Sequence, residues 1–96
     1  MVTVAEQFAI WLREHPHTWA AFEAIVAEYR AAGHTQWAVN AAREVLRWRT
    51  KARLPNVFAP FMAREWLRRH PDVPGFFRTN PSMADAATSP QMKLGL

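Results

Sequence analysis

The chain of 96 residues contains no cysteine, which excludes disulfides, thiolate metal sites and cysteine nucleophiles. Its three glycines, Gly33, Gly75 and Gly95, are too dispersed to form a glycine-rich phosphate loop, so we expect no NTP binding. No uncharged apolar run approaches the about 20 residues of a membrane span, and Glu6 stands where a signal peptide needs positive charge. These absences predict a cytoplasmic protein that does not engage the membrane.

Residues suited to catalysis or metal binding are also scarce. The basic half of the chain has only three carboxylates, Glu44, Glu65 and Asp72, and they show no metal-binding spacing. The histidines fall at expected helix ends or turns, without an HExxH pattern or a dense ligand cluster; they are His15, His17, His34 and His70. We therefore expect no enzymatic activity, no bound metal and no cofactor.

The length and composition predict one small helical domain. Half of the residues are hydrophobic and 21% are charged, which is typical of a globular chain. Apolar residues recur at helical spacing in four segments, over residues 4–14, 19–32, 36–51 and 57–69, and no strand pattern is present. We expect an all-α bundle over residues 1–78, with Phe76 and Phe77 folded back onto the core. Residues 79–96 contain two prolines and no periodicity, which predicts a disordered tail.

Local signals mark the ends of these helices. Thr3 followed by Glu6 forms a capping box pattern, and Pro16 forbids continuation of the first helix. Gly33 suits the left-handed position that ends the second helix. Side-chain N-caps are expected for the other three helices at Thr18, Thr35 and Asn56.

The segment 36–51 is the most informative helix because its wheel has two distinct faces. At about 100° per residue, one arc is apolar and includes Trp37, Val45, Leu46 and Trp48, so we expect Trp48 to pack in the core. The opposite arc carries the basic and amide side chains Gln36, Asn40, Arg43, Arg47 and Lys51. Arginine pairs well with guanine or phosphate, and asparagine or glutamine with adenine, so this stripe suits a nucleic-acid contact.

Positive charge is concentrated in the second half of the chain. Residues 1–42 have two arginines and four glutamates, a net charge of −2. Residues 43–78 have nine Lys and Arg against three Asp and Glu, a net charge of +6. Such asymmetry indicates an acidic partner, either nucleic acid or an anionic protein surface, although a solvated helix face is the plainer alternative.

Two further features favour nucleic acid. The order of a helix, the turn containing Gly33, and a helix with a basic face fits a helix-turn-helix loosely, although many helical hairpins share it. The segment 57–69 adds Arg64 and Arg68 on its own outer face, where a second basic strip could flank the first. The candidate binding residues are therefore Gln36, Asn40, Arg43, Arg47, Lys51, Arg64 and Arg68.

Residues 30–79 resemble a group of small proteins encoded by tailed phages and prophages. The pattern joins an Arg-Trp pair, an Asn-rich turn, an aromatic-Ala-Arg helix and a Pro-containing Gly-Phe-Phe end, carried here by Arg47, Trp48, Asn56, Phe58, Phe61, Ala63, Arg64, Pro71, Gly75, Phe76, Phe77 and Arg78. The chain departs from it in the turn, which has a single asparagine and adds Pro55 and Pro60.

The resemblance implies a phage accessory protein acting in a bacterial cytoplasm, and two functions fit it. The first is nucleic-acid binding through the basic faces of segments 36–51 and 57–69, with DNA ahead of RNA. The second is inhibition of a host nucleoprotein, of the anti-CRISPR or anti-restriction kind, by protein contact. The sequence leaves homodimer formation open.

Overall fold

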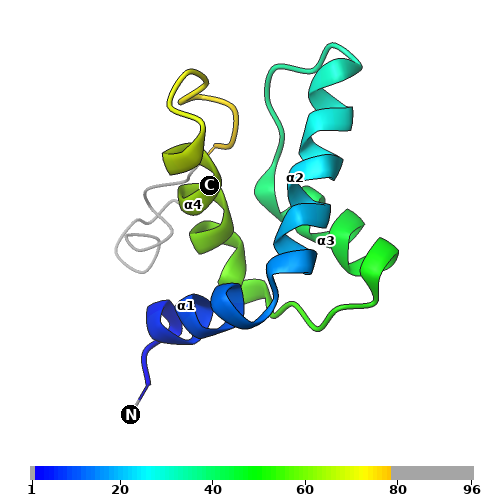
Figure 1. Ribbon diagram of the computed structural model, residues 1–96. Coiled ribbons are helices and arrows are strands. Elements are labelled where there is room, and N and C mark those ends of the chain that lie inside the picture. Colours follow the sequence, from blue (N-terminus) through cyan, green and yellow to red (C-terminus); the bar gives the residue numbers. More distant parts are fainter. Residues whose placement is uncertain (1, 79–96) are drawn as a thin grey trace, which may run out of the picture.

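The computed structural model describes residues 2–78, which form four α-helices and one 3₁₀ turn (Figure 1). The elements are α1 (Val4–Glu14), α2 (Pro16–Ala31), α3 (Val39–Thr50), η1 (Asn56–Phe58) and α4 (Ala59–Arg69). No strand forms within these residues, so the predicted all-α class is confirmed. The predicted tail over 79–96 lies outside the described residues.

The first two helices meet at His15. The predicted capping box is present: the Thr3 hydroxyl accepts from the Glu6 amide at 3.1 Å, and the Glu6 carboxylate accepts from the Thr3 amide at 2.8 Å. Helix α1 ends at Glu14, as predicted. Helix α2, however, begins at Pro16 and not at residue 19, because proline has the right φ for a first helical turn and needs no amide partner there. Thr18 is therefore inside α2 and does not cap it.

The connection between α2 and α3 is longer than expected. Gly33 adopts φ 101° just after the end of α2, as predicted for a left-handed terminator. The chain then stays extended, and α3 begins only at Val39 with Ala38 as its N-cap, so the predicted Thr35 cap is wrong. The seven residues 32–38 exceed the 3–4-residue turn of a helix-turn-helix. The pair thus has the order of that motif without its short turn.

A non-local pairing explains why this connection does not become helical. The Trp37 amide donates to the Phe76 carbonyl at 2.9 Å, and a single parallel bridge joins Trp37 with Phe77. The Trp37 ring also stacks on Tyr29 of α2, with centroids 3.8 Å apart. These contacts hold the segment along α2 (Figure 1).

The fourth helix is preceded by a 3₁₀ turn. Asn56 opens η1, and its side chain makes no capping hydrogen bond to η1 or α4, so the predicted Asn56 cap is wrong. Pro60 lies in the first turn of α4, where its missing amide costs nothing. Helix α4 ends at Arg69, immediately before His70 and Pro71.

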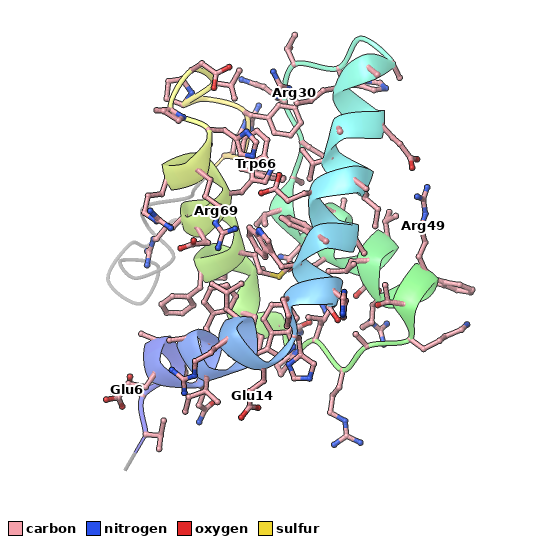
Figure 2. The ribbon with its side chains drawn as sticks, in the orientation of Figure 1. Glu6, Glu14, Arg30, Arg49, Trp66 and Arg69 are labelled. Atoms are coloured by element: carbon pink, nitrogen blue, oxygen red, sulfur yellow. The ribbon has the colours of Figure 1, made fainter. Side chains whose placement is uncertain are left out.

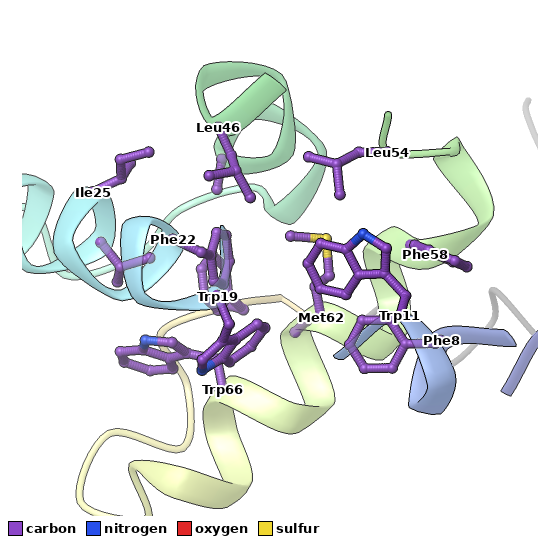
Figure 3. Close-up of a cluster of buried hydrophobic side chains, with 14 of the residues drawn as sticks. Phe8, Trp11, Trp19, Phe22, Ile25, Leu46, Leu54, Phe58, Met62 and Trp66 are labelled. Atoms are coloured by element: carbon purple, nitrogen blue, oxygen red, sulfur yellow. The ribbon is translucent and has the colours of Figure 1, made fainter. Parts of the chain in front are cut away.

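The core is largely aromatic and lies between α2, α3 and α4, with α1 across one end (Figures 1 and 3). Its centre is Trp66, which contacts Phe76 and Phe77 at centroid distances of 5.2 and 5.3 Å. Phe77 also stacks on Phe22 of α2 at 5.9 Å, which confirms that the Phe-Phe pair folds back. The most deeply buried large side chains are Trp66, Phe22, Phe77, Leu46, Met62 and Val26.

Candidate functional site

Arg43 is buried, which corrects the prediction that it belongs to an exposed stripe. Only 4% of the residue is exposed. Its Nη1 donates to the Leu54 carbonyl at 2.7 Å, and its Nη2 donates to the Glu44 carboxylate at 2.7 Å. The Nε atom has no hydrogen-bond partner within residues 2–78. Arg43 therefore ties α3 to the loop that follows it and is not free to reach a base edge.

Trp48 is exposed, which corrects the prediction that it packs in the core. With 72% of its surface accessible, it is the most exposed of the large apolar residues within 2–78. The reason is that the inward stripe of α3, the side that faces the core, consists of Val39, Ala42, Arg43 and Leu46. Trp48 follows Val39 by nine residues, which places it about 180° from that stripe at 3.6 residues per turn.

The end of α3 fixes the surroundings of Trp48. Thr50 closes the helix: its hydroxyl donates to the Leu46 carbonyl at 2.8 Å and accepts from the Ala52 amide at 3.2 Å. Lys51 then adopts the left-handed conformation, with φ 59°. This places its ammonium 5.5 Å from the centroid of the Trp48 ring, a cation–π contact.

Two adjoining hollows lie beside Trp48. The smaller, about 350 Å³, is lined by Arg47, Trp48, Lys51 and Ala52. The larger, about 430 Å³, is lined by Arg43, Glu44, Arg47, Ala52, Arg53, Leu54, Pro55 and Asn56. Arg47 and Ala52 belong to both, so the two hollows adjoin at these residues, by the end of α3 and the next loop. We call Arg47, Trp48, Lys51 and Arg53 the Trp48 face.

The Trp48 face is electropositive. Four cations line the two hollows, Arg43, Arg47, Lys51 and Arg53, against the single carboxylate Glu44. A hydrogen bond from Arg47 lowers the pKa of Glu44 below its ordinary value, and Arg43 adds to the effect, so Glu44 is ionised at neutral pH. The Arg47–Glu44 pair, at 2.9 Å, is exposed on both sides and so contributes little stability. Arg47 can therefore exchange Glu44 for an external anion at small cost.

The basic residues of α4 do not join this face. Neither hollow is lined by a residue of α4, so the predicted pairing of two flanking basic strips has no contact to support it within residues 2–78. The Arg64 guanidinium lies 5.5 Å from the Phe61 ring centroid. Arg68 pairs with Glu65 at 2.6 Å, and this hydrogen bond lowers the pKa of Glu65 and raises that of Arg68. Both arginines are exposed.

Two other exposed arginines contact a neighbouring helix. Arg49 of α3 pairs with Glu28 of α2 at 3.2 Å, and Figure 2 shows it at the edge of the molecule. Arg69 lies 5.0 Å from the Trp19 ring centroid and also pairs with Glu65 at 2.7 Å (Figure 2). A part of the +6 charge of residues 43–78 thus serves packing between helices.

The remaining predicted residues have mixed outcomes. Asn40 is exposed on α3, whereas Gln36 is exposed in the extended segment before the helix and so does not continue a helical stripe. Sequence reasoning missed Arg53, which lies in the loop, and Asn56, which begins η1, as residues that line the larger hollow. A helix wheel cannot include loop residues, and the only local signal for them was their proximity to Lys51.

The histidines are stacked on neighbouring aromatic rings in three cases: His15 on Trp11, His34 on Tyr29 and His70 on Trp66. No group of three or more potential metal ligands gathers within residues 2–78.

Among the described helices, none has the length and apolar character needed to cross a membrane. Comparison with protein-family models, with curated proteins and with solved structures finds no match for this chain.

Proposed function

We propose that this protein binds nucleic acid through the Trp48 face. The observation that carries the proposal is the exposed indole of Trp48 at the edge of a concave surface lined by four cations and one carboxylate. Arginine and lysine bind phosphates, and an exposed aromatic ring can stack on a base. The proposal keeps Arg47 and Lys51 from the predicted stripe, adds Arg53, and removes Arg43.

The contributions of Asn40, Arg64 and Arg68 are a separate part of the proposal. All three are exposed, and we propose that they contact a nucleic acid that extends beyond the Trp48 face. Because Arg68 is paired with Glu65, it offers less free charge than Lys51 or Arg53, which form no salt bridge within residues 2–78. We therefore expect these side chains to be secondary contacts.

The test is a binding titration at several salt concentrations. The parent protein should bind labelled nucleic acid, and the logarithm of the association constant should fall linearly with the logarithm of salt. The double variant Arg47→Ala, Arg53→Ala should reduce that slope by about 1.4 to 1.8 units, because two phosphate contacts are lost. The comparison variant is Arg64→Ala, Arg68→Ala, which removes the same charge from α4 and should reduce the slope less, because these side chains are the secondary contacts. Absence of parent binding at low salt would contradict the proposal.

A second candidate function is inhibition of a host nucleoprotein by protein contact, as the phage resemblance implies. The observation favouring it is the same exposed Trp48 with arginine beside it, because tryptophan and arginine are the residues most enriched among interface hot spots. A stable complex with a purified host nucleoprotein in gel filtration, formed without nucleic acid and lost in Trp48→Ala, would support this function in place of the first.

A further inference from the structure

We infer that the ligand of the Trp48 face is single-stranded nucleic acid, with an unpaired base stacked on Trp48 and the adjoining phosphates held by Arg47, Lys51 and Arg53. The inference rests on the proposed nucleic-acid function and specifies the class of substrate.

The Trp48 ring is exposed and open to stacking. An indole left 72% exposed gives up the large burial that tryptophan normally gains in a fold. The Lys51 ammonium lies over the ring but leaves most of the residue accessible. Such a ring next to positive charge is a stacking platform, and every base offers it a π-face once unpaired.

Cations line both hollows beside that ring. Lys51 and Arg47 line the smaller hollow together with Trp48, while Arg53 and Asn56 line the larger hollow on the other side of Arg47. A strand whose base stacks on Trp48 can therefore run its backbone along Arg47 towards Arg53. Both adjoining hollows are lined by cations, which suits a phosphate backbone.

Helix α3 is poorly suited to reading a duplex. Of the predicted stripe Gln36, Asn40, Arg43 and Arg47, Arg43 is buried and Gln36 precedes the helix. The side chains left for base edges in a major groove are therefore few. Within a duplex each base face is covered by the neighbouring base pair. The exposed indole could therefore stack on a base only at the ends of the duplex. The surface thus favours an unpaired strand.

The experiment measures binding of three labelled probes by fluorescence anisotropy at low salt. The probes are a single-stranded DNA of about 12 nucleotides, chosen from the usual 4–16-nucleotide site sizes, its RNA counterpart, and the blunt DNA duplex of the same sequence. The parent should bind the single strands more tightly than the duplex. The difference between the DNA and RNA arms shows which sugar the surface prefers, and both results support the inference.

Variants of Trp48 test the stacking itself. Trp48→Ala should weaken single-strand binding on the order of 10- to 100-fold, and Trp48→Phe should retain most of it because the ring remains. The matched control is Ile10→Ala, which truncates another exposed apolar residue, on α1. Circular dichroism melting of each variant establishes that the fold is retained. As a second readout, single-stranded DNA should quench an emission component present in the parent and absent from Trp48→Phe.

The failures are distinguishable. Equal binding of duplex and single strand, with no effect of Trp48→Ala but a steep salt slope, would overturn the single-strand inference while leaving the proposed function in place. No binding of any probe at low salt would overturn both, and the protein-contact function would then stand alone.

Discussion

The guanidinium of Arg43 donates to the carbonyl oxygen of Leu54 across 2.7 Å, and both residues are buried. The bond joins the middle of α3 to the loop that leads to η1. This loop carries Arg53 and ends at Asn56, the first residue of η1, so the bond also fixes the wall of the larger hollow. A charged side chain that sequence patterning assigns to the surface is therefore a structural tie.

Replacement of Arg43 by alanine should destabilise the protein by about 2 to 3 kcal/mol. The change removes hydrogen bonds from a charged donor and leaves the buried Leu54 carbonyl without that partner. Urea unfolding followed by circular dichroism measures the change in unfolding free energy. The control is Arg47→Ala, which should change stability little because Arg47 is exposed. An Arg43→Ala protein as stable as the parent, but deficient in nucleic-acid binding, would restore Arg43 to the binding surface.

Two tryptophans should respond to truncation in opposite ways. Trp66→Ala should cost about 3 to 5 kcal/mol, since Trp66 is 1% exposed at the centre of the core. Trp48→Ala should stay within about 0.5 kcal/mol of the parent, as is usual for a surface substitution. Thermal melts of the two variants compare them directly. If Trp48→Ala lost stability comparable to Trp66→Ala, the predicted core position of Trp48 would be the right one.

Lys51→Gly should stabilise the fold while weakening binding. A non-glycine residue in the left-handed region is disfavoured by roughly 1 to 2 kcal/mol. Glycine removes this strain from the folded state, but its larger conformational entropy in the unfolded state cancels part of the gain. The same change removes the cation over Trp48 and should lower the salt slope by about 0.7 to 0.9 units. Lys51→Ala is the control, since it loses the charge and keeps the strain. A lower melting temperature for Lys51→Gly than for Lys51→Ala would contradict the strain argument.

Acid should weaken the fold partly through Glu65. Hydrogen bonds from Arg68 and Arg69 hold the pKa of Glu65 below its ordinary value of 4.5, so its stabilising contribution is complete above that value. The contribution is lost as pH falls from 4.5 through the lower folded pKa, because in this range the unfolded chain binds a proton that the folded chain does not. Glu65→Gln should therefore flatten the dependence of unfolding free energy on pH below 4.5, measured by urea titrations at successive pH values. An unchanged acid slope in Glu65→Gln would show that other carboxylates carry it.

Helix α1 could be predicted to the residue because its signals are local. The capping box of Thr3 and Glu6 and the block at Pro16 depend only on neighbours in sequence. The four-helix fold followed from apolar spacing, which needs no knowledge of partners. Helix α2 was placed three residues late because Thr18 and Pro16 both offer a plausible start.

The face of α3 could not be predicted because its partners are distant. Trp37 pairs with the Phe76–Phe77 segment, which shortens the helix at its start. Leu54 turns its carbonyl towards α3, which draws Arg43 inward. A helical wheel based on hydrophobicity assigns Trp48 to the core and Arg43 to the surface. No residue near them in sequence indicates that Trp37 pairs with the Phe76–Phe77 segment or that the Leu54 carbonyl accepts from Arg43.

The stack of Phe22 on Phe77 makes the aromatic core depend on a segment that is made late in synthesis. Phe22 leaves the ribosome early, whereas Phe76 and Phe77, which cover it and Trp66, are among the last described residues to be made. Until they emerge, the growing chain presents an unfinished aromatic surface on α2 and α4, the kind of exposed apolar area that attracts chaperones and other nascent chains. We therefore expect the aromatic core to close only once Phe76 and Phe77 are available to pack on it.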